Sequence, residues 1–459
     1  MTARSRSGGH RIDSAAGGKV HVVGAGLAGL AAAVTLAGDG RAVVLYESGT
    51  HAGGRCRSFH DAELGVRIDN GNHLLLSGNR ASLSYVERIG ALDTFDRTAE
   101  ASIPFIDLAD GTRWEVRPSR GPVPWWILRT SRRVPGTRPR DYLAARRLGR
   151  AASGDTVAAI LDRDTTLFRR LWQPLVVAAL NTAADQASAV LFSRIVAETL
   201  GRGAAACRPM LPRDGLSESL VDPALEYLTR HGGEIRFGSR LKALDIAAGR
   251  VAALRFDDAC VAVPLPEQVV LAVPAHIAAR IVPGLVVPDD YAPIVNAHFR
   301  YDAPAGSPPF VGIIGGVAEW VFRKRSILSV TVSAADRLVG MPADELRDLL
   351  WRDVARALAL SPAPTPPSRI VKERRATFRA TPAQQARRPH AGTAWNNLHL
   401  AGDYIDTGLP ATIEGAIRSG IVAAGCVTRG RDSELAPAGF RPPASSLPTT
   451  AQDRERAMS

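Results

Sequence analysis

A strand, a glycine-rich turn and an alanine-rich helix follow one another near the amino terminus. The mostly apolar run Val20–Val23 leads into Gly24, Gly26 and Gly29, which have the spacing G-x-G-x-x-G. The first glycine of this motif permits a tight turn, the second lets a pyrophosphate approach the backbone, and the third lets the helix lie close to the strand. The helix amino terminus then offers N–H groups and a favourable dipole to the phosphates. The chain is therefore expected to begin with a dinucleotide-binding βαβ unit.

An acidic residue follows where such a unit needs one. A second expected strand, 42–46, is followed by Glu47, which stands 18 residues after Gly29. A carboxylate at this strand end can accept hydrogen bonds from the hydroxyls of a ribose. A lone glycine motif is a weak signal, but the strand, turn, helix and acid together predict a dinucleotide site.

A glycine pair and two arginines come soon after the acid, at Gly53, Gly54, Arg55 and Arg57. Glycines permit close backbone approach and guanidinium groups suit phosphate oxygens, so this segment indicates a further contact with the same cofactor. A nicotinamide-binding domain does not need such a segment. The alternative interpretation is that both arginines are solvated loop residues.

With the late segment Ala401-Gly402-Asp403, these motifs resemble the flavoprotein family of amine oxidases, protoporphyrinogen oxidases and phytoene-type desaturases. The resemblance implies an α/β fold: a Rossmann-type FAD-binding domain with a parallel sheet, an interleaved α+β substrate domain and a helical subdomain. It implies FAD as the cofactor, with Glu47 on the adenosine ribose and Asp403 near the ribityl–pyrophosphate region. The residues expected to bind FAD are Gly24, Gly26, Leu27, Ala28, Gly29, Glu47, Gly54, Arg55, Gly402, Asp403, Thr412 and Ile413.

Composition excludes several other classes of protein. The 459 residues are 46% hydrophobic, which predicts a large buried core. The four cysteines lie far apart without C-x-x-C spacing, so neither a disulfide framework nor a metal site is expected. The net charge of +12 comes almost wholly from arginine, and we expect no nucleic-acid partner because no nucleic-acid motif accompanies it. We find neither a secretory signal nor an apolar run of spanning length, and expect a cytoplasmic protein.

The order of predicted elements indicates a discontinuous architecture. Three separated segments are expected to form the FAD-binding domain: 19–100, 205–273 and 370–430. The remaining segments are expected to be a helical membrane and substrate subdomain (101–204), a substrate domain (274–369) and two disordered tails (1–18 and 431–459).

Two further stretches narrow the family. Gly71–Asn79 reads G-N-H-L-L-L-S-G-N, and Trp172–Leu175 reads W-Q-P-L and is followed by Asn181 and Thr182. Together they resemble the hydroxysqualene dehydroxylases, which are FAD-dependent enzymes of squalene and hopanoid biosynthesis, and the likeness covers most of residues 19 to 430. Taken alone, Trp172 is more simply explained as a core residue.

The carboxyl-terminal motif departs from that of amine oxidases. Those enzymes place a tyrosine two residues before the glutamate of E-G-A, as one wall of an aromatic cage, whereas Thr412 stands there in this chain. An aromatic face recognises an amine through cation–π attraction and a threonine does not. This difference favours an isoprenoid substrate over an amine.

The resemblance implies reductive removal of the allylic hydroxyl of hydroxysqualene, which gives squalene. The protein must then donate a hydrogen bond or a proton to the leaving hydroxyl and exclude water. Three residues near the expected flavin front are candidates for this role: His73, Asp69 and Glu414. An equally good interpretation of Glu414 is structural, because an acidic residue in the first turn of a helix interacts favourably with the helix dipole.

Other functions stay open at this stage. A phytoene-type desaturase would transfer hydride in the opposite direction, an amine oxidase is disfavoured by Thr412, and a flavin- or lipid-binding protein would have no turnover. The sequence does not name the electron donor that reduces the flavin.

An arginine-rich segment raises the question of membrane contact. Eleven arginines lie between Arg113 and Arg150, around the apolar run Trp125–Leu128. Such a segment suits peripheral contact with an anionic membrane, here the inner face of the cell membrane. The alternative is a helical segment whose tryptophans are core and whose arginines are merely solvated.

Overall fold

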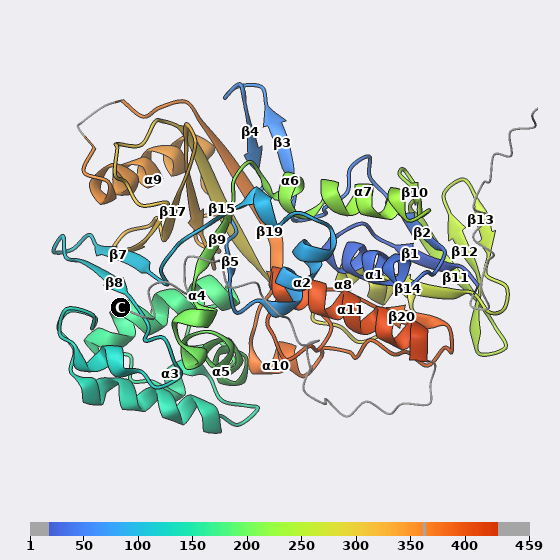
Figure 1. Cartoon of the computed structure of the whole chain (residues 1–459), viewed down its shortest axis with the longest axis horizontal. Helices are drawn as coiled ribbons and strands as arrows, with labels where there is room; N and C mark the ends of the chain where they lie inside the picture. Colours follow the sequence, from blue (N-terminus) through green and yellow to red (C-terminus); the bar gives the residue numbers. More distant parts are fainter. Residues whose placement is uncertain (1–17, 361–363, 430–459) are drawn as a thin grey trace, which may run out of the picture.

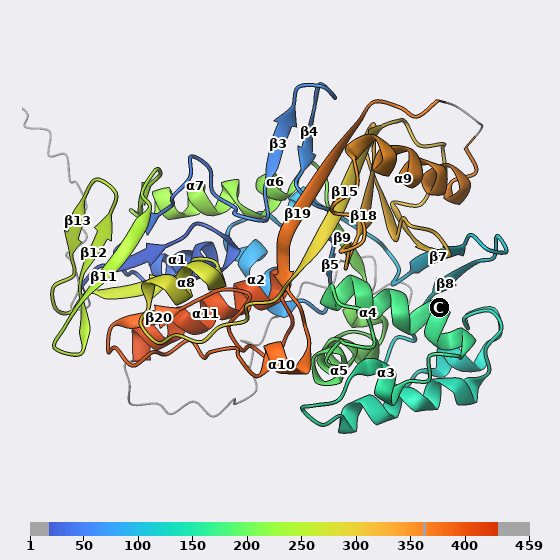
Figure 2. The same cartoon turned by 180° about the vertical axis from the view of Figure 1, so that it is seen from behind.

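The computed structural model describes residues 18–360 and 364–429, and these form two lobes that lie side by side (Figure 1). One lobe contains a parallel sheet covered by helices, and the other contains a larger sheet with helices on both of its sides. Viewed from behind, two long strands, β15 (Tyr291–Arg300) and β19 (Ser368–Phe378), run from the second lobe towards the first (Figure 2).

The first lobe is built on a five-stranded parallel sheet with the order β10-β2-β1-β14-β20. Its strands are β1 (Val20–Val23), β2 (Val43–Tyr46), β10 (Glu234–Arg236), β14 (Gln268–Leu271) and β20 (Leu398–Leu400). Strands β1 and β2 are buried at every residue, as expected for a parallel sheet that is covered on both faces. The parallel sheet, built from distant parts of the chain, confirms the predicted α/β class.

Two glycines let the helices of this lobe pack closely. Helix α1 (Leu27–Gly38) lies beside helix α11 (Ile413–Arg429), while α7 (Asp222–Arg230) covers another part of the sheet. A Cβ on Gly29 would stand 1.8 Å from the Gly24 carbonyl oxygen, and one on Gly420 would stand 2.1 Å from that of Ala28. Any larger residue at either position would therefore push α1 away from its strand or from α11.

The second lobe is built on a seven-stranded sheet with the order β19-β15-β18-β17-β16-β7-β8. The five strands not yet defined are β7 (Ile103–Asp107), β8 (Arg113–Val116), β16 (Phe310–Ile314), β17 (Trp320–Lys324) and β18 (Ile327–Val332). Helix α9 (Ala343–Ala357) covers one face, where Phe299 and Trp351 share a core. The inner face carries Phe105, Phe310 and Trp320 and joins the core of the helical segment.

Two parts of this sheet differ from the sequence prediction. Strands β7 and β8 lie in the segment 101–204, which is predicted to be mostly helical, and most of β19 lies in 370–430, which is assigned to the FAD-binding domain. In the structure β7 pairs with β16, and β19 pairs with β15. Apolar alternation indicates which side of a strand is buried, but it does not identify the strand with which it pairs.

The chain between β8 and β9 (Pro209–Pro212) is helical. Its elements are 3₁₀ helices at Trp125–Leu128, Pro139–Arg150, Leu200–Arg202 and Ala204–Ala206, a π-helical turn at Phe168–Trp172, and α3 (Val157–Ile160), α4 (Gln173–Leu180) and α5 (Ala189–Glu198). Among the described residues, no helix combines the length and apolar character that crossing a membrane requires.

The remaining elements are shorter. Those of the amino-terminal half are β3 (Ser58–Asp61), β4 (Val66–Asp69), β5 (Leu75–Leu76), α2 (Arg80–Arg88), a 3₁₀ turn at Leu92–Thr94, β6 (Phe95–Arg97) and α6 (Leu216–Leu220). The others are β11 (Leu241–Ala247), β12 (Arg250–Phe256), β13 (Cys260–Ala262), α8 (Ala275–Ile281) and α10 (Pro382–Gln385). Apart from Gly18, the two predicted tails lie outside the described residues.

Candidate active site

The glycine turn and the Gly53–Gly54 loop lie against each other at the carboxyl edge of the parallel sheet. Gly24 has a φ of +106° and donates its N–H to the Tyr46 carbonyl at 2.7 Å. The N–H of Gly53 donates to the Ala25 carbonyl at 2.8 Å, which fixes the loop beside the turn. A Cβ on Gly26 would meet no heavy atom within 4 Å. The space in front of Gly26 is therefore open.

The first turn of α1 can offer only its backbone to a ligand. Gly26 is the residue that caps α1, while the side chains of Leu27 and Ala28 are buried in the core of the lobe. The first N–H groups of a helix have no partner within the helix, so they are available to phosphate oxygens.

Glu47 lies directly beside this turn. Its Oε2 accepts a hydrogen bond from the Ala25 N–H at 2.9 Å, and its Oε1 accepts one from the Gly49 N–H at 2.8 Å. A carboxylate oxygen can accept more than one hydrogen bond, so both oxygens keep capacity for the hydroxyls of a ribose. The two backbone contacts hold the carboxylate at the edge of the sheet.

Arg55 and Asp403, which are predicted from separate motifs, contact each other. Arg55 Nη2 lies 2.7 Å from Asp403 Oδ1, and Arg55 Nη1 donates to the Ala376 carbonyl at 2.7 Å. The carboxylate of Asp403 raises the pKa of Arg55, so this guanidinium is charged at all accessible pH values. Gly54 adjoins Gly26, because a Cβ on Gly54 would stand 3.5 Å from the Gly26 Cα. These two motifs thus meet at the glycine turn.

A buried arginine that the sequence analysis did not identify shapes the loop after Gly402. The Arg388 side chain is fully buried and donates to the backbone carbonyls of four loop residues: Asp403, Tyr404, Ile405 and Leu409. Burial lowers the pKa of Arg388 to about 10, which still leaves it charged near neutral pH. Arg388 therefore fixes the backbone that carries Asp403. No local motif marks it, because its partners are carbonyls of a distant loop.

The start of α11 is held by its own side chains. Thr412 Oγ1 accepts a hydrogen bond from the Gly415 N–H at 3.0 Å, and Ile413 is the first residue of the helix. Gly402, which has a φ of +153°, donates its N–H to Ser419 Oγ at 2.9 Å. These contacts fix Gly402 against α11 and close the first turn of that helix.

Glu414 has contacts that account for it as a helix cap. Its carboxylate is buried and accepts hydrogen bonds from the Ala81 N–H (3.0 Å), the Ser82 N–H (2.8 Å) and Ser82 Oγ (2.7 Å) at the start of α2. It also pairs with Arg418 at 3.1 Å. A carboxylate at a helix amino terminus is stabilising. These contacts favour the structural interpretation of Glu414 over the role of proton donor.

The Gly71–Asn72–His73 loop docks on the inner face of the seven-stranded sheet through amides and a hydroxyl. Asn72 Nδ2 donates to Thr331 Oγ1 at 3.0 Å, and Thr331 Oγ1 donates to Asn296 Oδ1 at 2.8 Å. Asn296 Nδ2 in turn donates to the Asn70 carbonyl at 3.3 Å. This closed chain of hydrogen bonds fixes the loop that carries His73.

The His73 imidazole is the candidate proton donor whose contacts leave it most accessible. The residue is exposed, and its Nδ1 lies 3.4 Å from the Gly71 carbonyl oxygen. Protein atoms near the ring disfavour its charged form through partial desolvation, and this lowers the pKa of His73 below its usual 6.5. The imidazole is therefore neutral near pH 7 and carries one N–H that can donate to a hydroxyl.

Asp69 is engaged at both oxygens. Its Oδ1 accepts hydrogen bonds from Ser58 Oγ at 2.6 Å and from the Leu216 N–H at 2.9 Å, while its Oδ2 pairs with Lys324 Nζ at 2.6 Å. Both carboxylate oxygens are therefore occupied by contacts within the protein. These contacts leave Asp69 less available to a substrate hydroxyl than His73.

A second histidine near Asp69 was not identified from the sequence. His298 is buried on β15, and its Nδ1 lies 2.8 Å from Ser329 Oγ. Burial lowers the pKa of His298 to about 4, so it is neutral over the physiological range. In the sequence, His298 lies in a stretch of alternating apolar and polar residues, so nothing distinguishes it from an ordinary strand residue.

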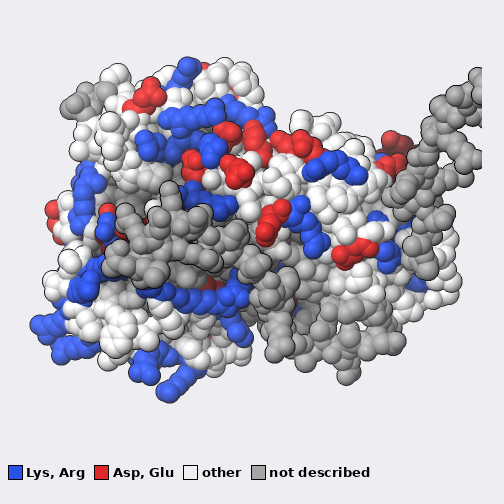
Figure 3. All heavy atoms as spheres, in the orientation of Figure 1, with Lys and Arg blue, Asp and Glu red and all other residues white. Residues whose placement is uncertain are grey.

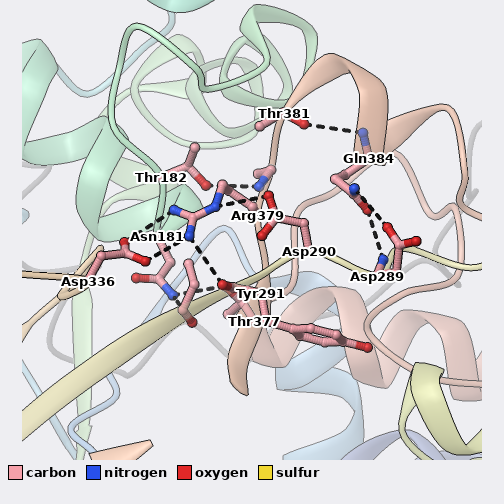
Figure 4. Close-up of polar contacts among 12 residues, drawn as sticks. Asn181, Thr182, Asp289, Asp290, Tyr291, Asp336, Thr377, Arg379, Thr381 and Gln384 are labelled. Carbon is pink, nitrogen blue, oxygen red and sulfur yellow. Dashed lines mark hydrogen bonds and ion pairs between the residues drawn. The ribbon is translucent and has the colours of Figure 1, made fainter. Parts of the chain in front are cut away.

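A polar network at the end of α4 attaches the helical segment to the sheet (Figure 4). Asn181 donates to the Ala292 carbonyl at 3.0 Å and to Thr377 Oγ1 at 2.9 Å, and Thr182 Oγ1 accepts from the Ala380 N–H at 2.8 Å. Figure 4 also shows the Arg379 guanidinium between two carboxylates, with ion pairs of 2.8 Å to Asp336 and 3.2 Å to Asp290. The polar pair that follows W-Q-P-L in the sequence thus lies where the helical segment meets the seven-stranded sheet.

The apolar residues of the helical segment continue the inner face of the sheet. Trp172 is buried and packs edge-on against Phe192, which agrees with its interpretation as core. Phe105 and Trp320 belong to the same cluster. Among the described residues, no group of three or more histidine, cysteine, aspartate or glutamate side chains is arranged to hold a metal ion.

Comparison with known proteins identifies the family to which the chain belongs. Residues 27–428 match the family model of the flavin containing amine oxidoreductases. A hydroxysqualene dehydroxylase of Sinorhizobium fredii is 46% identical over 405 residues, which are 88% of this chain and 97% of that protein. One of Rhodopseudomonas palustris is 47% identical over 409 residues, or 89% and 98% of the two chains. The chain belongs to the hydroxysqualene dehydroxylase family.

More distant relatives support the fold alone. A zeta-carotene desaturase of Capsicum annuum is 22% identical over 480 residues, which cover 88% of this chain and 79% of that protein. The crystal structure of a putative protoporphyrinogen oxidase from an Exiguobacterium species is 18% identical and has a TM-score of 0.65. The likeness covers 90% of this chain and 99% of that chain. The predicted flavoprotein fold is thereby confirmed.

Membership of this family makes the protein a flavin-dependent oxidoreductase, as predicted. The residues at the glycine turn fit a flavin dinucleotide, because an open helix amino terminus, a carboxylate and a glycine loop meet there. The buried Tyr404 hydroxyl next to Asp403 has no hydrogen-bond partner among the described protein atoms. A bound group would give such a hydroxyl a partner.

Proposed function

We propose that the protein binds FAD and catalyses the reductive removal of the allylic hydroxyl of hydroxysqualene, which gives squalene. The observation that carries this proposal is the identity of 46% and 47% to two hydroxysqualene dehydroxylases over nearly their whole lengths. A desaturase relative at 22% identity supports only a common fold, so the desaturase alternative rests on weaker ground. Thr412, in place of a cage tyrosine, disfavours amine oxidation.

FAD is proposed as the flavin because the site contains the parts that a dinucleotide needs. The backbone at Gly26, Leu27 and Ala28 would hold the pyrophosphate, Glu47 would accept hydrogen bonds from the adenosine ribose, and the Arg55–Asp403 pair would lie towards the ribityl chain. Reduced flavin, when bound, supplies a hydride. The electron donor that reduces it is proposed to be a separate molecule, because the chain carries one dinucleotide motif.

The protein must make the hydroxyl a better leaving group. The C–O bond of an allylic alcohol breaks to leave a delocalised cation, the hydroxyl departs as water with a proton drawn from solvent, and the carbon then gains the hydride. A neutral imidazole would assist by donating a hydrogen bond to the departing oxygen, without giving up its own N–H proton. We assign the contact with the leaving hydroxyl to His73, whose neutral imidazole has an N–H to donate. The hydrogen-bonded chain Asn72–Thr331–Asn296 would hold the His73 loop during this step.

The long hydrocarbon of the substrate needs an apolar surface. We assign this role to the inner face of the seven-stranded sheet and the helical segment opposite, where Phe105, Trp114, Trp172, Phe310 and Trp320 share one core. Aromatic and aliphatic walls exclude water, and water would otherwise trap the allylic cation. Contact with an anionic membrane also belongs to the proposal, because a squalene-like molecule partitions into bilayers.

Product analysis tests the proposal. The purified protein, reduced anaerobically, should convert hydroxysqualene to squalene, and mass spectrometry would identify the product. The same protein in its oxidised form should leave phytoene and putrescine unchanged. Desaturated phytoene, or an aldehyde from putrescine, would replace the proposal by the desaturase or the amine oxidase alternative.

A further inference from the structure

The helical segment leaves several large apolar side chains in solvent. The exposed fractions are 65% for Trp125, 58% for Leu128, 48% for Val123 and 56% for Leu143. These are four of the nine large hydrophobic residues that are exposed in the described part of the chain, and they fall within 21 positions of one another. Exposed apolar residues that gather in one place mark an interaction surface more often than scattered ones do.

The two neighbouring tryptophans have opposite roles. Trp126 and Ile127 are buried, and the Trp126 ring packs edge-on against Tyr142 with 5.3 Å between the ring centroids. The expectation that the whole Trp125–Leu128 run faces a membrane is therefore corrected. The 3₁₀ helix is anchored to the core through its two middle residues, and this holds Trp125 and Leu128 outward.

Positive charge surrounds these side chains. Between Val123 and Arg150 the sequence has eight arginines and one acidic residue, Asp141. Arg146, Arg147 and Arg150 are exposed and line one hollow in the surface. Figure 3 shows Lys and Arg side chains gathered over the helical segment, at the lower left of that view, with few acidic side chains among them.

We propose that residues 123–150 form a docking surface for an anionic lipid bilayer. Trp125, Leu128 and Leu143 enter the boundary between headgroups and acyl chains, and the surrounding arginines contact the lipid phosphates. An aromatic and aliphatic cluster within a basic surface suits this boundary, whereas a nucleic acid has no apolar layer to receive exposed leucines. The inference rests on the proposed function in one respect, since that function requires a substrate held in membranes.

Vesicle sedimentation without substrate tests the docking surface separately from catalysis. The flavin-loaded protein should sediment with vesicles of phosphatidylglycerol and phosphatidylcholine, and only weakly with phosphatidylcholine alone. The variant W125S/L128S should bind the anionic vesicles at least about tenfold more weakly, because it removes two apolar insertions. Leu265→Ser is the matched control, since Leu265 is 80% exposed in the other lobe and should leave binding unchanged.

The arginines need a charge-matched pair of variants. R146E/R147E should weaken binding about thirtyfold, because each basic residue near such a surface contributes about 1 kcal/mol, or about fivefold. R240E/R323E makes the same change of net charge with exposed arginines outside this surface and should have a much smaller effect. Equal losses in the two variants would overturn the proposal, because net charge alone would then explain binding.

Two other outcomes would also overturn it. Unchanged sedimentation of W125S/L128S would mean that these side chains do not insert. Loss of a dimer in W125S/L128S, measured by light scattering, would assign the surface to a second copy of the chain. Squalene formation from detergent-dispersed hydroxysqualene is a separate readout: its retention in W125S/L128S would support the docking surface as a membrane contact, and its absence in the wild type would count against the proposed function alone.

Discussion

Gly26→Val separates cofactor binding from folding more cleanly than a change at any other glycine of the motif. Gly26 has a φ of −72°, which any residue adopts, and a Cβ there would meet no heavy atom within 4 Å. The substitution should therefore leave the cofactor-free protein folded. Its branched side chain would nevertheless occupy the place where the pyrophosphate is proposed to approach the backbone.

The magnitude follows from the contacts that would be lost. A phosphate at a helix amino terminus accepts hydrogen bonds from backbone N–H groups, and each such charged bond contributes roughly 1.5–3 kcal/mol. The loss of two of them would weaken flavin binding by about 3–6 kcal/mol, or roughly 10²- to 10⁴-fold. The purified variant should then be colourless.

Two measurements check this reasoning. Flavin absorbance per protein measures occupancy, and thermal unfolding of the cofactor-free proteins should give the same Tm for the variant and the wild type. Gly29→Val is the contrasting variant, because its Cβ would stand 1.8 Å from the Gly24 carbonyl oxygen and should prevent folding. Full flavin occupancy in Gly26→Val would refute the proposed path of the pyrophosphate.

Three further predictions concern the other candidate residues. Glu414→Ala should lower the stability by about 3 kcal/mol and the Tm by several degrees, because it leaves the α2 amino terminus without its buried carboxylate, and an unchanged Tm would contradict the capping role. His73→Ala should keep its flavin and lose roughly 10²- to 10⁴-fold in kcat for hydroxysqualene, whereas an unchanged kcat would remove His73 from the mechanism. Burial lowers the pKa of His298 from 6.5 to about 4, so the folded state disfavours the charged imidazole. The contribution of His298 to the free energy of unfolding is therefore complete above pH 6.5, and it should fall by up to about 3 kcal/mol as the pH drops towards 4. His298→Gln should lose this part of the acid sensitivity in urea titrations, and an identical pH dependence in both proteins would show that His298 is not its source.

The sequence predicts the nucleotide-binding part of the molecule well because local chemistry determines it. The tight turn at Gly24, the close packing at Gly29 and the acid at Glu47 each follow from a motif of fixed spacing. Arg388 and the Asn72–Thr331–Asn296 chain were not predicted, because their partners lie far away in the sequence. Pairing in the seven-stranded sheet was missed for the same reason.

The sequence also did not predict which side chains of the helical segment point inward. Trp125 and Trp126 are adjacent and chemically identical, yet one is 65% exposed and the other 6%. A short irregular helix has no period long enough to show which residues face inward. Tertiary packing against Tyr142 decides it.

The central claim is that the bound flavin gives electrons to an allylic alcohol. An anaerobic single-turnover experiment tests it directly: the reduced enzyme is mixed with hydroxysqualene, while flavin absorbance and product are both followed. The account predicts that the oxidised flavin spectrum returns as one squalene forms for each flavin. A flavin that stays reduced with hydroxysqualene, or an oxidised flavin that becomes reduced on addition of phytoene, would contradict the account.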